Sequence, residues 1–252
     1  MFDIQKAGLL KRVSAWILDL ILLVILSAGF AWIISDVVGY DAKSTQLEAY
    51  YTQYETEYNT SFTYTPEEYE AMTEEQKANY DAAYKALLED QNVIDLYNMV
   101  IRLTIVILSI GILLSTLVLE FAIPLWLRNG QTVGKKIFGL AVMRTNSVRV
   151  NGVCMFIRSI LGKYTIETMI PVLIVTMWML NLAGMGMTVV LVGLLLAQLV
   201  VVIVTSNNAL IHDLLADTVV VDLASQMIFQ SEEDRLAYQQ REAAEKAERQ
   251  FY

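Results

Sequence analysis

Four long apolar segments dominate the pattern of hydrophobic and polar positions along the 252-residue chain. They cover approximately residues 13–35, 99–126, 165–183 and 186–206. Each approaches the roughly 20 residues that a helix needs to cross a hydrocarbon core about 30 Å thick. We therefore expect an all-α polytopic membrane protein with four transmembrane helices.

The last two apolar segments are separated only by the stretch NLAGMGM (181–187), which predicts a tight turn between two antiparallel helices. The first segment has two interpretations, a retained anchor or a signal peptide. It is long for a signal peptide, carries Asp19 and lacks a convincing small-residue cleavage site. We therefore expect it to remain in the protein as a transmembrane helix.

A long polar stretch separates the first two apolar segments. Residues 39–98 are acidic and hold ten of the thirteen tyrosines, and the sequences TPEE (65–68) and TEEQ (73–76) predict helix N-termini with capping boxes. We expect the last of these helices to run from about residue 74 into the second transmembrane helix. The insertion is either a solvated helical cap or a surface that attracts cations or binds a partner.

Two further polar stretches predict small elements outside the apolar segments. The β-prone sequence KIFGLAVMRTNSVRVNG (136–152) has a polar turn at its centre and predicts a small β-hairpin-like segment at the membrane surface. A charged helix follows residue 230, with Ser231 as its expected N-cap, and is either solvated or a docking element. The expected organisation is a first transmembrane helix in 1–38, the helical insertion in 39–98, a membrane core in 99–222 and the tail in 223–252.

Composition narrows the possible chemistry. The chain is 56% hydrophobic, whereas soluble domains are about 45–50% apolar. The single Cys154 and the single His212 exclude an internal disulfide and a thiolate or histidine metal site. The stretch GQTVGKK (130–136) is one residue short of a phosphate-binding loop and has Lys136 where that loop needs a hydroxyl. We therefore expect no enzymatic activity and no cofactor.

The distribution of charge predicts the orientation of the helices. Residues 121–166 carry seven Lys and Arg residues and no acidic residue, whereas residues 41–98 carry three Lys against thirteen Asp and Glu. Because basic loops stay in the cytoplasm, we expect both termini and residues 127–164 to be cytoplasmic and the acidic insertion to lie outside. The basic segment 128–163 would then face anionic lipid headgroups. Nothing in this pattern indicates a nucleic-acid partner.

Ionisable residues inside or beside the apolar segments form the candidate site. A charge at the centre of a bilayer costs about 2.5–3.5 kcal/mol on the insertion scale, so Asp19 needs a partner from another helix. Arg12 lies seven residues before it on the same helix face, but we expect its side chain to extend toward the headgroups. The predicted topology brings the candidate residues to one depth in the inner third of the bundle. The candidates for ion or proton binding are Asp19, Asp213, Arg12, Glu120 and Glu167, with Arg158, Asn207, Asn208 and His212 as supporting polar residues.

Four motifs together resemble the RDD family of prokaryotic membrane proteins. They are KRVSAWILDLIL (11–22), NGQTVGKKIFGLAVMR (129–144), IRSIL (157–161) and HDLLADTVVV (212–221). The family is named for one arginine and two aspartates, which would be Arg12, Asp19 and Asp213. The usual Ala-Gly-Thr after the second aspartate is Ala-Asp-Thr in residues 216–218. The resemblance implies a multi-pass protein of the cell membrane and a transport function, with sodium–proton exchange proposed for some members.

Two functions are compatible with these residues. The predicted cluster holds four carboxylates against three cations, which favours a transporter that exchanges Na⁺, another monovalent cation or protons. Because four helices are few for a carrier, we expect a homo-oligomer. The alternative is a non-transporting scaffold or regulatory subunit, in which ion pairs hold the helices together and the external loop or the tail binds a partner.

Overall fold

The computed structural model describes residues 6–182 and 184–250, with the backbone alone for residue 250, and is 74% helical. Four of its helices are long and apolar enough to cross a membrane, at Leu9–Val38, Gln91–Trp126, Gly152–Met179 and Met185–Val204. The first is α1 and the last is α10 (Met185–Val204). The predicted all-α class with four transmembrane helices is thereby confirmed.

The third spanning helix begins earlier than the predicted residue 165. It consists of α8 (Gly152–Phe156), the π-helical stretch η2 (Ile157–Met169) and α9 (Ile170–Met179). Asn151 caps its start by accepting a hydrogen bond from the amide of Cys154 at 2.8 Å. The predicted start was wrong because Arg158 and Lys163 lower the hydropathy of this segment. Both cations lie inside the helix, where carboxylates from other elements pair with them.

The second spanning helix changes its hydrogen-bonding pattern at a proline. It consists of α5 (Gln91–Thr116), the π-helical η1 (Leu117–Ala122) and α6 (Ile123–Trp126), with Pro124 near the start of α6. Pro124 has no amide hydrogen to donate to the carbonyl of Glu120 four residues earlier. The hydroxyl of Ser159 donates to this carbonyl instead, at 2.5 Å. The released backbone acceptor therefore joins the second and third spanning helices, as a non-aqueous environment requires.

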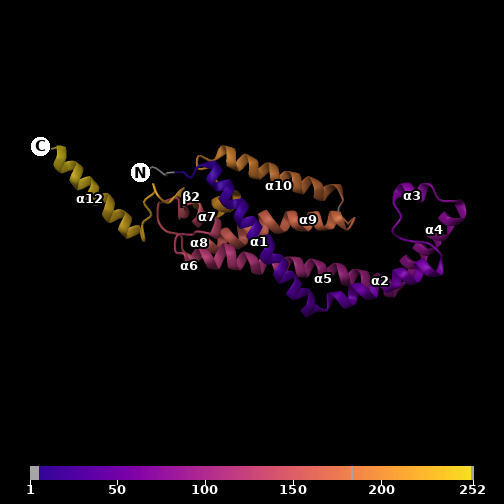
Figure 1. The fold of residues 1–252 in the computed structure, drawn as a ribbon. Helices are drawn as coiled ribbons and strands as arrows, with labels where there is room; N and C mark the ends of the chain where they lie inside the picture. Colours follow the sequence, from indigo (N-terminus) through magenta and orange to yellow (C-terminus); the bar gives the residue numbers. More distant parts are fainter. Residues whose placement is uncertain (1–5, 183, 251–252) are drawn as a thin grey trace. The chain divides into compact units, whose positions relative to one another are not determined.

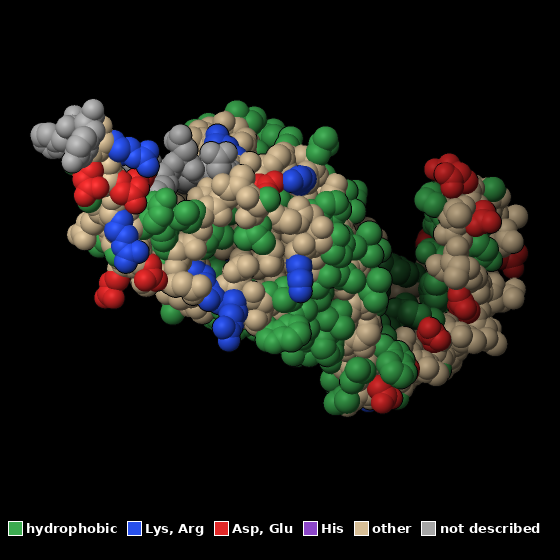
Figure 2. Space-filling view, turned by 60° about the vertical axis from the view of Figure 1, so that its left-hand side comes forward, with side chains coloured by type: hydrophobic (Ala, Val, Ile, Leu, Met, Phe, Trp, Pro, Cys, Tyr) green, Lys and Arg blue, Asp and Glu red, His purple; other side chains and the backbone are tan. Residues whose placement is uncertain are grey.

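The chain divides into two compact units. Unit 1 comprises Met1–Ala28 and Ile112–Tyr252, and unit 2 comprises Gly29–Gly111. In unit 1, α9 and α10 form the predicted antiparallel pair, and a small sheet lies at the end where α1 begins and α10 ends (Figure 1). Hydrophobic side chains cover a large part of the visible face of unit 1 (Figure 2), as expected for a surface in contact with lipid.

The sheet of unit 1 differs from the predicted local hairpin. Strand β1 (Leu140–Arg144) pairs antiparallel with β2 (Thr218–Asp222), so Leu140 lies opposite Asp222 and Arg144 opposite Thr218. The expected turn at 145–147 is present, but its return strand contributes only an isolated bridge between Met143 and Arg149. The prediction was wrong about the partner because β2 offers a run of three valines, and residues of the two strands pack together in a buried cluster on each face of the sheet. The short helices α7 (Val133–Ile137) and α11 (Ile211–Leu215) precede the two strands.

Unit 2 contains the helical insertion, formed by α2 (Tyr40–Glu57), α3 (Pro66–Glu70) and α4 (Glu74–Glu89). Both predicted capping boxes are confirmed, at Thr65 with Glu68 and at Thr73 with Gln76. The expected continuous helix into the second span is wrong, because α4 ends at Glu89 and Asp90 is extended. The Asp90 carboxylate accepts the amide of Asn92 at 2.8 Å and so begins α5 as a separate helix.

The C-terminal tail forms α12 (Glu232–Gln250), and Ser231 caps it as predicted by accepting the amide of Asp234 at 3.1 Å. Charged side chains of both signs lie along this helix (Figure 2), and Glu242 pairs with Lys246 across one turn at 3.0 Å. The first turn of α12 also contacts the turn after β1, where the side-chain amide of Asn146 donates to Glu232 at 2.8 Å. The start of the tail helix is therefore held against the small sheet.

The capping box at the start of α4 gives a test of the local structure of unit 2. Replacing Thr73 with Ala removes the oxygen that accepts the amide of Gln76, which costs about 1 kcal/mol at a helix N-terminus. We expect amide hydrogen exchange in the first turn of α4 to become about fivefold faster. Thr45→Ala, an exposed site inside α2, is the control, and equal exchange in both variants would contradict the capping role.

Candidate functional site

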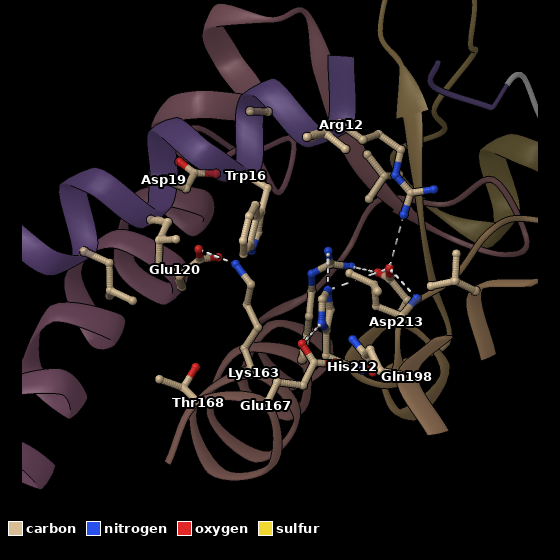
Figure 3. A pocket seen from close by; sticks show the side chains of 18 of the residues that line it. Arg12, Trp16, Asp19, Glu120, Lys163, Glu167, Thr168, Gln198, His212 and Asp213 are labelled. Carbon is tan, nitrogen blue, oxygen red and sulfur yellow. Dashed lines mark hydrogen bonds and ion pairs between the residues drawn. The ribbon is translucent and has the colours of Figure 1, made fainter. Parts of the chain in front are cut away.

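A cavity of about 580 Å³ lies in unit 1 among α1, η1, η2, α9, α10 and α11. Its wall contains all five residues predicted to bind ions or protons, which are Arg12, Asp19, Glu120, Glu167 and Asp213. Three of the four supporting residues, Arg158, Asn208 and His212, line it as well. Asn207 is not in the wall, but its backbone carbonyl accepts a hydrogen bond from Arg12 at 3.2 Å. Figure 3 shows the charged side chains converging on this cavity.

Asp19 is buried because the segment before β1 supplies its partners. Its carboxylate accepts the hydroxyl of Thr132 at 2.5 Å and the amide of Gly134 at 2.8 Å. The ammonium group of Lys135 lies 3.8 Å away. The carboxylate therefore fixes the start of α7 against α1. The sequence analysis rejected the GQTVGKK stretch as a phosphate loop and used it as part of a family motif, but it did not assign Thr132 and Lys135 to the site. The available signal was a group of polar residues between two spans.

Gly134 permits this contact between α7 and α1. A Cβ atom at Gly134 would collide with the backbone carbonyl oxygen of Ala15, and it would lie 2.9 Å from a carboxylate oxygen of Asp19. Such distances are shorter than real Cβ atoms adopt, and the nearest obstacle is backbone that cannot rotate away. The close packing of the two helices therefore requires glycine at this position.

Asp213, on α11, is the most strongly paired carboxylate of the cavity. It forms a buried ion pair with Arg158, accepts the hydroxyl of Thr218 at 3.2 Å and accepts the amide of Leu210 at 3.3 Å. Arg12 lies farther away, with 3.9 Å between the nearest nitrogen and oxygen. Burial would raise the pKa of Asp213, but the positive charge of Arg158 outweighs it and holds the pKa well below its usual range.

The predicted extension of Arg12 toward the headgroups is wrong. Its side chain is only 13% exposed and turns into the cavity, toward the Asn207 carbonyl and Asp213 (Figure 3). The buried acceptors at the end of α10 explain this direction, because they offer a guanidinium partners that hydrocarbon does not.

The other two carboxylates of the cavity pair with side chains of η2 and α11. Glu120 forms an ion pair with Lys163, and Glu167 contacts the Nδ1 atom of His212 at 2.7 Å. The Nε2 atom of His212 lies 3.2 Å from a nitrogen of Arg158, which can only donate. His212 is therefore neutral, with its proton on Nδ1. Burial away from water lowers the pKa of His212 and outweighs the opposing negative charge of Asp213, which agrees with this assignment.

The structure removes the predicted excess of negative charge. Four carboxylates line the cavity, but Lys135 joins Arg12, Arg158 and Lys163 as a fourth cation. The predicted ratio of four to three was wrong because Lys135 lies outside the apolar segments. Burial away from water lowers the pKa of Lys135 to about 8, although Glu120 opposes this shift. Lys135 is therefore a cation that can release its proton near neutral pH.

These features define a multi-pass membrane protein with a cavity, lined by paired charged residues and by apolar residues, at one end of its spanning helices. The family model described as "RDD family" matches residues 6–217, which is most of the chain. The chain belongs to the RDD family, as the sequence motifs indicated. Comparisons with curated proteins and with solved structures give no match. Among the described residues, no group of three or more His, Cys, Asp or Glu side chains could hold a metal ion.

The contact at Gly134 predicts a large effect of one methyl group. Gly134→Ala forces α7 away from α1 and weakens the hydrogen bonds to Asp19, so we expect the protein to lose about 1–3 kcal/mol of stability. Thermal unfolding in detergent measures this loss. Gly152→Ala is the matched control, because a Cβ atom there meets nothing within 4 Å. Equal unfolding temperatures for the two variants would contradict the close contact.

The lowered pKa of Lys135 predicts a dependence of stability on pH. The unfolded chain keeps this proton up to about pH 10.5, whereas the folded protein releases it near pH 8. Because the folded state then binds fewer protons, its stability rises between these values, by up to about 1.4 kcal/mol per pH unit. In detergent, Lys135→Met should lose this rise, whereas Lys136→Met, at an exposed neighbour, should keep it. If stability rose equally with pH in the wild type and in both variants, the lowered pKa of Lys135 would be contradicted.

Proposed function

We propose that this RDD family protein transports Na⁺ or another monovalent cation across the membrane in exchange for protons. The observation that carries the proposal is Asp19, a carboxylate inside a spanning helix that faces a cavity beside Lys135. Intramembrane carboxylates at cavities mark ion and proton paths in other membrane proteins. The RDD membership and the four spanning helices support a location in the membrane, which this function requires.

The pairing of the carboxylates favours Asp19 over Asp213 as the exchanging group. Asp213 pairs with Arg158, whose guanidinium does not lose its proton at physiological pH. Asp19 instead lies near Lys135, whose pKa is about 8. When Lys135 releases its proton, the charge opposite Asp19 disappears and a monovalent cation can replace it. When Lys135 takes up a proton again, the cation is released.

The distribution of basic residues supports an orientation for this site. Basic loops are retained in the cytoplasm, and the segment 128–163 is rich in Lys and Arg. We therefore propose that the cavity end of the bundle and both termini are cytoplasmic, that this segment contacts anionic headgroups of a prokaryotic cell membrane, and that the protein acts as a homo-oligomer.

Purified protein in lipid vesicles tests the proposal. With a pH-sensitive dye inside, an imposed Na⁺ gradient should drive a pH change in vesicles that contain the wild type. Asp19→Asn should reduce this signal to that of protein-free vesicles while the protein remains monodisperse in detergent. Asp36→Asn, an exposed aspartate on the same helix, is the control and should transport normally.

The alternative function is a non-transporting scaffold or regulatory subunit. It is favoured by the pairing of every carboxylate in the cavity with a cation or with His212. In that case Asp19→Asn would unfold the protein and the wild type would move no cation in the vesicle assay. That pair of results would replace the transport proposal with the scaffold.

A further inference from the structure

The cavity has an apolar half that cation exchange does not use. Leu20 and Leu23 of α1 and Leu194 and Leu195 of α10 line it. Leu23 follows Arg12 by eleven residues, which is about 16 Å along a helix. This length is about half of a hydrocarbon core, the depth of one lipid leaflet. The cavity is therefore charged at the end of the bundle and apolar toward the middle of the membrane.

The apolar half is open to the outer surface of the spanning helices. Leu20 is 40% exposed and Leu195 is 60% exposed, although both line the cavity. In a membrane this surface faces hydrocarbon, so a molecule can enter the cavity sideways from the bilayer. Trp16 lines the cavity near its charged end. This position fits the membrane interface, where a tryptophan ring contacts both headgroups and acyl chains.

Arg12 is the least compensated cation at the charged end. Among the described residues, it has one backbone carbonyl at 3.2 Å and one carboxylate oxygen at 3.9 Å, and that carboxylate belongs to the buried pair with Arg158. Lys163 and Arg158 each have a carboxylate in direct contact. The ammonium group of Lys135 lies 3.2 Å from the Thr132 hydroxyl and 3.8 Å from Asp19, a carboxylate that no ion pair with Arg158 engages. A partly buried guanidinium with so few acceptors favours an added anion, and its planar fork matches a phosphate.

We propose that the cavity binds one anionic phospholipid, with its phosphate on Arg12 and one acyl chain along α1 and α10. The headgroup of such a lipid would lie at the charged end of the cavity, and its acyl chain would extend along the apolar half toward the middle of the membrane. The α10 helix of a second copy fits less well, because α10 carries no charged residue that could pair with Arg12. The inference does not depend on cation transport.

Native mass spectrometry of the protein in a mild detergent tests the proposal. The probes are phosphatidylglycerol and phosphatidylcholine with identical acyl chains, added in equal amounts. We expect one bound phosphatidylglycerol per chain and little bound phosphatidylcholine. Arg12→Gln should weaken phosphatidylglycerol binding about tenfold, the effect of losing one charged hydrogen bond. Arg102→Gln, at an exposed arginine of α5, should leave binding unchanged.

A second variant tests the acyl-chain half without altering any charge. Leu195→Trp fills the apolar wall and should also weaken phosphatidylglycerol binding, whereas Leu196→Trp, on an exposed neighbour outside the cavity wall, should not. Equal binding of the two lipids would overturn the proposal. Undiminished phosphatidylglycerol binding by folded Arg12→Gln and Leu195→Trp variants would overturn it as well. A dimer that binds no lipid and that dissociates on substitution of Leu195 would also overturn it.

Discussion

The burial of the Asp19 carboxylate is the constraint on which the rest of unit 1 depends. A charge at this position is stable only if donors reach it from outside its own helix. Thr132 and Gly134 provide them, and in doing so they hold the start of α7 against α1. The position of α7 then places Lys135 in the cavity wall and leads the chain into β1.

The same principle repeats through the cavity. Glu120 pairs with Lys163, Asp213 with Arg158 and Glu167 with His212, so each carboxylate joins elements that are distant in the chain. Removing one partner from a buried pair leaves an uncompensated charge, which costs more than the pair itself contributes. The pairs therefore specify which helices meet.

The sequence predicted the class of fold, and eight of its nine candidate site residues line the cavity. Both predictions succeeded because hydropathy and the position of a charge within an apolar segment are local properties. It did not predict the partners of Asp19, since Thr132 and Lys135 lie in a polar segment whose contacts depend on the tertiary fold. The start of the third span was misplaced for a related reason. Arg158 and Lys163 lower the hydropathy locally, and only the folded bundle supplies the carboxylates that let them enter the helix. The partner of β1 was missed because pairing across two spans leaves no local signal.

The pairing of β1 with β2 also has a consequence for biosynthesis. The two strands flank the third and fourth spanning helices in the chain, so the sheet forms only after both helices have been synthesised. Asp213, the partner of Arg158, arrives at the same late stage. Until translation passes α10, the newly made protein therefore holds β1 without its partner strand and Arg158 without its carboxylate.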